Sequence, residues 1–349
     1  MDNSSHGSAT GAIPLHRIAV VRPFAQFLEN IGAPVERGFR QTGMPYCALE
    51  DVNNYVPSHR FWAFLTHMTR IEGIEDLGFR VGTYYGANSA DPKLTKLLLQ
   101  APTLYQGLLQ ASELVNRTIT HCQLGVLQPP GSGHAYFFHS PSCKADNPAI
   151  EQIGWYGIST LIGMVRVFTG PQWQPSEIGM MTDQAPSHHI LEQLPDSRIR
   201  PLQKTSYIAL ENALLSLPPL PCEAATHVAA EPATSLLHYE ALSNDFTGSL
   251  EQVLNSYIRE DDLNVTFAAG LCNTSTRTLQ RRLTELGTCY IEVLAHARFH
   301  SASQMLKDPR IKITDIAKQL GYRHTAHFSR AFRRIAGVTP RMYRQQYTH

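Results

Sequence analysis

The C-terminal part of the chain contains one short pattern twice, and this repeat constrains the fold more than any other feature of the sequence. Each copy joins an apolar helical segment to a second helical segment through a two-residue turn. The segments are predicted at 265–272 and 275–283 in the first copy and at 313–320 and 325–334 in the second. A helix, a tight turn and a second helix form a helix-turn-helix unit, whose second helix can lie in the major groove of DNA. The repeat therefore predicts an all-α domain with two such units.

The segment between the two copies predicts one connecting helix over 290–307, closed by Asp308 and Pro309. At 1.5 Å per residue this helix would extend roughly 27 Å. The major groove returns to the same face of B-form DNA about every 34 Å. A rigid connector of this length suits two helices that enter adjacent turns of the groove.

The apolar residues of each second helix predict which side is buried. In the first unit Leu279, Leu283 and Leu286 fall on one stripe. Ser275 is placed to cap the same helix, because its hydroxyl can accept a hydrogen bond from a free backbone amide of the first turn. In the second unit the buried stripe is predicted to be Phe328, Ala331 and Phe332.

Arginine and glutamine occupy the opposite side of these helices. The guanidinium fork of arginine matches the O6 and N7 atoms of guanine, and the amide of glutamine matches adenine. The candidate base-reading residues of the first unit are Arg277, Gln280 and Arg281. In the second unit Arg330 is the one strong donor fork on the exposed side, which also carries Thr325, Ala326 and Ser329. Phosphate contacts are predicted at Ser275, Arg282, Arg333, Arg334 and Arg341, with a solvated surface as the alternative.

Charge is divided along the chain in the same way. Residues 263–349 hold 14 Lys and Arg against 4 Asp and Glu, a net charge of +10, whereas the preceding residues hold 16 against 25, a net charge of −9. A polyanion is attracted to the first of these segments and repelled by the second. The coincidence of positive charge with the helix-turn-helix pattern predicts double-stranded DNA as a partner.

Length and composition predict two domains. A chain of 349 residues is long for one domain, and the Pro- and Ala-rich segment 217–244 is typical of a linker. We therefore expect one domain over 12–216 and a DNA-binding domain over 245–349. No apolar run is long enough to cross a membrane, the polar first ten residues are unlike a signal peptide, and six scattered cysteines suggest reduced thiols. These features predict a protein of the cytoplasm.

The N-terminal half is predicted to mix helices and strands. Helices are expected at 24–32, 59–71, 94–100, 104–115 and 148–168, and another, after the linker, at 245–258. Strands are expected at 118–127, 134–139, 178–182 and 207–210, with a Pro- and Gly-rich turn at 129–133. Periodicity alone leaves α+β and α/β open for this half. We expect the α+β class, followed by the all-α domain with two helix-turn-helix units joined by a helix.

The C-terminal motifs resemble the DNA-binding domain of the AraC/XylS family of bacterial transcription regulators. The resemblance covers roughly residues 247–347, and several spaced motifs agree in order: Ser275-x-Arg277-x-Leu279-x-Arg281-x-Leu283, Ile313-x-Asp315-Ile316-Ala317, Gly321-Tyr322, Phe328-Ser329-Arg330-Ala331-Phe332 and Gly337-Val338-Thr339-Pro340-x-x-Tyr343-Arg344. It implies base-facing positions at Arg277, Arg281, Thr325, Ala326 and Arg330. It further implies a sequence-specific regulator, an activator, with RNA polymerase as a partner.

The N-terminal half more loosely resembles the effector domain of AraC-like regulators in which the sensor comes first. The matching pieces are 77–82, 101–104 and 172–175. This resemblance implies a domain that binds a small molecule, forms a homodimer, or both. Arg60, Arg80 and Arg166 are candidates to neutralise a ligand carboxylate, with ordinary salt bridges as the alternative. A fatty acid, an amino acid, a sugar and no ligand at all stay open.

Catalytic and metal sites find little support in the sequence. Sixteen histidines occur, but His134, His139, the pair His188 and His189, and the pair His121 and Cys122 do not show closed metal-ligand spacing. No phosphate-binding loop, nucleophile elbow or zinc-protease motif is present. We therefore predict no metal, no cofactor and no enzyme. The alternative is a DNA-repair or other enzyme that is delivered by the helix-turn-helix domain and needs an activated thiolate. The surroundings of Cys47, Cys122, Cys143 and Cys222 are mostly neutral or acidic, which favours the regulator.

Overall fold

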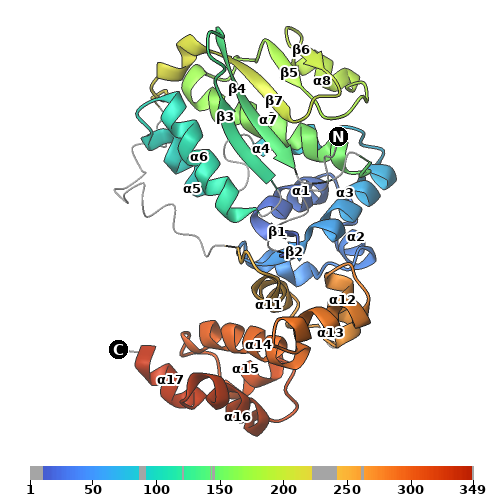
Figure 1. Cartoon of the computed structure of the whole chain (residues 1–349), viewed down its shortest axis with the longest axis vertical. Helices are drawn as coiled ribbons and strands as arrows, with labels where there is room; N and C mark the ends of the chain where they lie inside the picture. The colour runs from blue at the N-terminus through green and yellow to red at the C-terminus, as the bar shows by residue number, and fades with distance from the viewer. Residues whose placement is uncertain are drawn as a thin grey trace. The chain divides into compact units, whose positions relative to one another are not determined.

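The computed structural model describes residues 11–85, 92–119, 122–141, 143, 146–221, 242–260 and 263–347. The chain divides into two compact units. The N-terminal unit comprises residues 19–43 and 60–242, and the C-terminal unit comprises residues up to 18, 44–59 and 243–349. Figure 1 shows the mixed helices and strands of the first and the helices of the second.

The N-terminal unit is built on a five-stranded sheet. Its strands are β3 (Cys122–Leu127), β4 (His134–Pro141), β5 (Glu177–Gly179), β6 (Arg198–Arg200) and β7 (Ser206–Glu211). The order across the sheet is β3-β4-β7-β5-β6, and every pair is antiparallel except β5 with β6.

Eight helices belong wholly or mostly to the described part of this unit. They are α1 (Ile18–Asn30), α2 (Val35–Gln41), α3 (Ser58–Glu72), α4 (Leu77–Tyr85), α5 (Pro92–Gln100), α6 (Leu104–Thr118), α7 (Ile150–Thr169) and α8 (His188–Gln193), with a 3-10 turn at Asn212–Ser216. The long helix α7 supplies Trp155, Ile158 and Phe168 to a core that also contains Phe137 from β4 and Ile208 from β7. Figure 1 shows α7 behind β3, β4 and β7.

Two glycines let α4 lie directly against α7. A Cβ atom at Gly78 would stand 1.9 Å from the carbonyl oxygen of Gln152, and one at Gly82 would stand 2.6 Å from Cβ of Ser159. Both distances are shorter than side chains tolerate, so larger residues would separate the helices. The close approach brings Phe79 of α4 over α7, which matters for the pocket described below.

The predicted α+β class followed by an all-α region is confirmed, and the element boundaries differ in places. The strand predicted from residue 118 begins at Cys122, because α6 continues to Thr118. Helix α1 begins at Ile18 rather than at residue 24, with Pro23 inside it. Pro148 precedes α7, whose cap is Ala149, instead of occupying its first turn. The pattern did not predict α2, α4 or α8, which are short, or the strand β6.

The C-terminal unit contains seven helices in its described part: α11 (Phe246–Ser256), α12 (Val265–Leu271), α13 (Thr276–Glu285), α14 (Tyr290–Leu306), α15 (Ile313–Gln319), α16 (Thr325–Ala336) and α17 (Pro340–Tyr347). The connector α14 matches the predicted helix closely and ends with Lys307 as its cap. Phe328 and Phe332 of α16 pack with Ile316 of α15 and Leu306 of α14 in one core.

A small antiparallel pair of strands also belongs to this unit. Strand β1 (Leu15–Arg17) pairs with β2 (Tyr55–Pro57), and a 3-10 turn at Tyr46–Glu50 precedes β2. The backbone N–H of Ile13 donates to Oγ of Ser249, and that of Tyr55 donates to Oγ of Ser256, both on α11. The predicted division at 12–216 and 245–349 therefore differs from the contacts, since residues 11–18 and 44–59 fold with the C-terminal helices.

The predicted linker lies largely outside the described residues, which omit 222–241, as they omit the first ten residues. Its described beginning packs on the N-terminal unit. The carbonyl of Leu217 accepts from the N–H of Leu104, and the N–H of Leu220 donates to the carbonyl of Val167. No helix within the described ranges is both long and apolar enough to cross a bilayer.

The imidazole of His139 predicts a loss of stability in acid. Its ring packs against α7 where Gly157 leaves room, and its Nδ1 finds no hydrogen-bond partner among the described residues. Burial lowers the pKa of His139 from 6.5 to about 4. The folded state thus binds the proton more weakly than the unfolded state, so the contribution to stability is full above pH 6.5 and is lost as the pH falls toward 4.

We expect the free energy of unfolding to fall by about 2 kcal/mol from this residue between pH 7 and pH 4.5. The measurement is urea unfolding of the wild-type protein and of His139→Gln across that range. The variant, which carries no titrating ring, should show a correspondingly shallower decline. An identical pH dependence in the two proteins would contradict this assignment.

Candidate nucleic-acid interface

The two helix-turn-helix units share the geometry of their turns. The second residue after the first helix of each unit has a positive φ, 51° at Asn273 and 76° at Gly321, a conformation that asparagine and glycine adopt most readily. The next residue then closes the turn, since the N–H of Thr274 donates to Ala269 and that of Tyr322 to Ala317, both at 3.0 Å. The repeat seen in the sequence is therefore a repeat of structure.

The expected cap and most of the buried stripes are confirmed. Oγ of Ser275 accepts from the N–H of Thr278 at 3.2 Å, and Leu279 and Leu283 are buried. The expectation for Leu286 was wrong, because α13 ends at Glu285 and the side chain of Leu286 is 54% exposed. In α16, Phe328 and Phe332 are buried and Ala331 is half-buried.

The predicted base-reading side chains of α13 are exposed. Arg277, Gln280 and Arg281 all face solvent, and they lie on the side opposite the buried leucines. Nε of Arg281 stands 3.8 Å from Oε1 of Glu285, and the two side chains are 70% and 63% exposed. A pair at this distance and exposure contributes little free energy. Arg281 is thus available to a ligand.

Helix α16 places its residues at matching positions. Arg277 and Ala326 are the second residues of their helices, and Arg281 and Arg330 are the sixth. Ala326 and Arg330 are exposed, whereas Thr325 and Ser329 are half-buried. The two units therefore present one arginine each at the same helical position, on helices joined by α14, which at 1.5 Å per residue extends about 26 Å.

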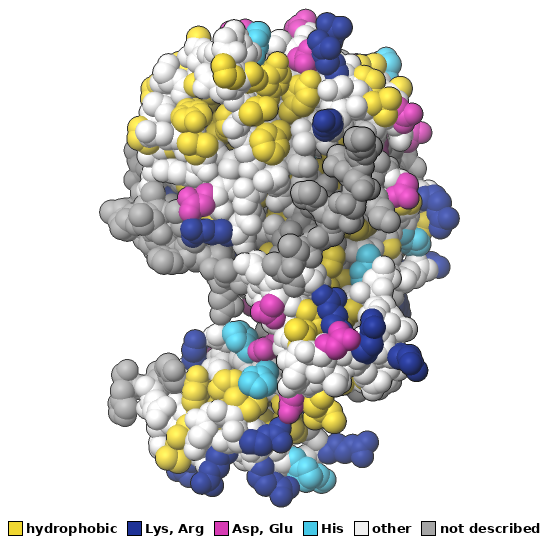
Figure 2. Space-filling model, viewed as in Figure 1, with side chains coloured by type: hydrophobic (Ala, Val, Ile, Leu, Met, Phe, Trp, Pro, Cys, Tyr) yellow, Lys and Arg dark blue, Asp and Glu magenta, His cyan; other side chains and the backbone are white. Residues whose placement is uncertain are grey.

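The predicted phosphate contacts divide into two groups. Arg333, Arg334 and Arg341 are exposed, as is Ser275 at the start of α13. Figure 2 shows Lys and Arg side chains gathered at the end of the C-terminal unit that α16 and α17 form. A positive surface around a recognition helix suits the sugar-phosphate backbone, which carries most protein–DNA hydrogen bonds.

Arg282 departs from the expectation of a phosphate contact. Its Nη2 donates to the carbonyl oxygen of Gly11 at 2.5 Å, and its Cζ lies 3.9 Å from the ring centroid of Phe246. The guanidinium is half-buried between these groups. Because Nη2 and one face of the guanidinium have partners within the unit, Arg282 is less available to phosphate than the exposed Arg333 and Arg334.

The sequence reasoning missed three exposed residues near α16. Arg323 and His324 precede the helix, and His327 follows Ala326 within it. Their side chains lie at the N-terminal end of α16, and His324 packs near His327 with ring centroids 5.6 Å apart. The signal available in the sequence was the cluster of basic and aromatic residues between the turn and the helix.

Comparison with known proteins gives the class of this region. The family model described as helix-turn-helix domain matches residues 268–346. The ornithine utilization regulator of Pseudomonas aeruginosa is 40% identical over 78 residues, which are 22% of this chain and 23% of that protein. The transcriptional activator NphR of a Rhodococcus species is 26% identical over 98 residues, 28% of this chain and 29% of that protein.

A solved structure is similar over more of the chain. The transcriptional regulator CdpR of Pseudomonas aeruginosa aligns with 94% of this chain and 98% of its own, at 19% identity and a TM-score of 0.42. The curated relatives above are matched over less than a third of their own length. Residues 268–346 form a helix-turn-helix domain, and the motifs that resemble AraC-type regulators lie largely within it. The looser resemblance of the N-terminal half stays a prediction.

The three arginines considered for a ligand have different surroundings in the N-terminal unit. The guanidinium of Arg60, a half-buried residue, donates to the carbonyl of Gly43. Arg80 forms an ion pair with Asp76, with Nε 2.6 Å from Oδ1. Burial alone would raise the pKa of Asp76, but the hydrogen bonds of Arg80 and His189 lower it. Arg60 and Arg80 therefore have partners within the chain.

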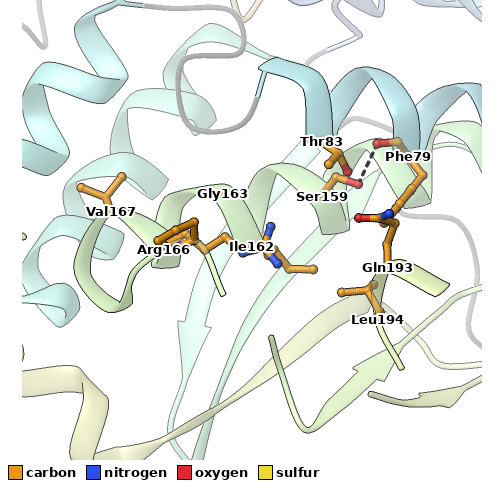
Figure 3. A pocket seen from close by; sticks show the side chains of 10 residues that line it. Phe79, Thr83, Ser159, Ile162, Gly163, Arg166, Val167, Gln193 and Leu194 are labelled. Atoms are coloured by element: carbon orange, nitrogen blue, oxygen red, sulfur yellow. Dashed lines mark hydrogen bonds between the residues drawn. The ribbon is translucent and has the colours of Figure 1, made fainter. Parts of the chain in front are cut away.

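Arg166 lies at a pocket. The cavity measures about 300 Å³ and is lined by residues of α4, α7, α8 and the segments that follow α7 and α8: Phe79, Thr83, Ser159, Ile162, Gly163, Arg166, Val167, Pro171, Gln193 and Leu194. Figure 3 shows Arg166 and Ile162 on α7 between Thr83 on one side and Gln193 and Leu194 on the other. This is a volume in which small molecules bind.

Proposed function

We propose that the protein is a sequence-specific DNA-binding transcription regulator, an activator, whose N-terminal unit responds to a small molecule and forms a homodimer. It would act on promoter DNA in a bacterial cytoplasm, with RNA polymerase as its partner. The observation that carries the DNA-binding part is the pair of exposed arginines, Arg281 and Arg330, at the same position of two recognition helices on one connector. A two-unit reader of this kind spans two turns of the major groove.

The activator and effector parts have separate support. NphR, which the C-terminal region resembles, is a transcriptional activator. The pocket of the N-terminal unit offers a place for a small molecule, and a ligand that prefers one arrangement of a dimer shifts DNA affinity by linkage. Dimerisation would double the number of helix-turn-helix units on one operator.

The cysteines favour this function over the enzyme alternative. Burial raises the pKa of Cys122 to about 12, that of Cys143 to about 11 and that of Cys272 to about 12. An alkyl-acceptor thiolate needs the opposite shift. Cys222 lies outside the described residues.

The test selects DNA from a random pool with the full-length protein and footprints the best site. We expect an enriched sequence with two protected blocks about one helical turn apart for each subunit, and sedimentation of the complex as a dimer. Transcription from a promoter that carries the site should rise when the protein is added. Failure to enrich any sequence over the starting pool would overturn the proposal.

Arg334 should contribute to DNA binding without regard to sequence. The change Arg334→Ala is expected to weaken the selected site and random DNA by the same factor, because an exposed arginine on the backbone side meets phosphate. The slope of log affinity against log salt should become shallower by about one. Fluorescence anisotropy at four salt concentrations measures both effects. A loss confined to the selected site would show that Arg334 reads a base.

A further inference from the structure

The charge of the pocket in the N-terminal unit identifies the class of molecule that fits it. Arg166 is the one charged side chain among the described residues that line it. Its Nε donates to the carbonyl of Trp173 at 2.8 Å, and no carboxylate of the described residues acts on its charge. Burial lowers the pKa of Arg166. A half-buried cation without a counter-charge costs desolvation free energy that an anion would offset.

The other lining side chains define the rest of the ligand. Ile162, Val167, Pro171 and Leu194 supply an apolar wall. The hydroxyl of Ser159 stands 2.8 Å from the carbonyl of Trp155 and 3.3 Å from that of Phe79, so its hydrogen is in use and its lone pairs remain to accept. Thr83 and Gln193 are exposed at the mouth and can do either. The lining thus combines one cation with a mostly apolar surface.

We propose that this pocket binds a small carboxylic acid with an apolar body, its carboxylate held by the guanidinium of Arg166 between α4 and α7. The proposal rests on the effector role proposed above and names its ligand class. The apolar body lies along α7 against Ile162 and Val167. The carboxylate and the guanidinium form a charge-assisted pair in a site shielded on one side by protein.

The test measures binding to the full-length protein by calorimetry, with a panel of aliphatic and phenyl-substituted monocarboxylic acids of about four to ten carbon atoms, a size that the cavity admits. Each acid is paired with its primary amide, which has the same shape and no charge. We expect at least one acid to bind and its amide to bind at least tenfold more weakly. A panel without any binder, or equal binding of acid and amide, would overturn the proposal.

Two variants locate the site. Arg166→Gln removes the charge, and Thr83→Trp blocks the mouth from an exposed position of α4; each should weaken the acid at least tenfold. Arg117→Gln is the matched control, because Arg117 is exposed, pairs with Glu113 and does not line the pocket. Unfolding curves without ligand verify that each variant folds. Unchanged binding in Arg166→Gln would refute the site. The DNA-selection experiment does not depend on the pocket, so a negative result for ligand binding would not contradict the proposed DNA binding.

A second inference concerns Arg282 and the strands of the C-terminal unit. Gly11, which accepts from Arg282, also forms a β-bridge with Asp245, and the next segment is fixed to α11 through Ile13 and Ser249 at 2.9 Å. Arg282 also stacks on Phe246 of α11. We infer that residues 11–18 and α11 hold recognition helix α13 in place through Arg282, which is a positioning residue rather than a phosphate contact.

Because β1 runs directly into α1, and β2 into α3, the same strands connect the two units along the chain. The inference rests on the proposed DNA binding. Hydrogen exchange measured without DNA tests the positioning role of Arg282 separately from DNA binding. In the full chain, Arg282→Gln should speed amide exchange in α13 and weaken the selected site at least tenfold, with a smaller effect on random DNA. Arg282→Lys, which keeps a donor and a cation, should restore part of both. Equal loss on all DNA with unchanged exchange would make Arg282 a phosphate contact and refute the inference.

Discussion

Replacing Arg281 by alanine is expected to reduce affinity for the selected DNA site by about 1–3 kcal/mol, roughly 5- to 150-fold. The side chain is 70% exposed on the face of α13 opposite the buried leucines, and its contact with Glu285 at 3.8 Å is too weak to hold it back. Its fork can meet both acceptors of a guanine edge. The loss should therefore be accompanied by relaxed preference at one base pair of the site.

The measurement is a titration of Arg281→Ala against the selected site and against a set of sites with every single base changed. The variant should bind random DNA almost as tightly as the wild-type protein does, because its phosphate contacts are unchanged. Arg330→Ala tests the equivalent position of the second unit and should relax a base pair about one helical turn away. Equal losses on all sequences for Arg281→Ala would show that this arginine meets the backbone.

The sequence was informative about the C-terminal helices because local signals specify them. A capping serine at 275, a helical period of leucines and a glycine at 321 all act within a few residues, and the structure realises each of them. The end of α13 was misjudged because Leu286 continues the apolar pattern while the chain turns at Gly287, whose φ is 74°. Helical periodicity describes a stripe and does not specify where the helix stops.

Contacts between residues far apart in the chain could not be predicted from the sequence. Arg282 looked like its neighbour Arg281, and only its partner Gly11, 271 positions away, separates their roles. Strands β1 and β2 have three residues each, too few for an alternating pattern, and their pairing decides which unit residues 11–18 join. Arg166 was a candidate by charge alone. The pocket that distinguishes it from Arg60 and Arg80 requires α4, α7 and α8 together.

Phe332→Ala is expected to have the largest effect on stability, a loss of about 3–5 kcal/mol in the free energy of unfolding. The ring is 2% exposed and contacts three other aromatic rings, with centroid distances of 5.0 Å to Phe299, 5.3 Å to Tyr343 and 5.8 Å to Phe328. Alanine leaves a cavity among helices that are too short to be stable alone. Urea unfolding followed by circular dichroism measures the loss.

Met342→Ala is the matched control, since this side chain on α17 is 51% exposed and its removal should change stability by less than about 0.5 kcal/mol. We expect the loss of stability in Phe332→Ala to be confined to the second helix-turn-helix unit. The buried Leu279 and Leu283 belong to α13 in the first helix-turn-helix unit. Phe332 belongs to the core that α14, α15 and α16 form around the second. Hydrogen exchange in Phe332→Ala should therefore rise in α15 and α16 before α13, and the DNA footprint should shrink to one block. Uniform exchange across α13 and α16 would instead show that both units unfold as one.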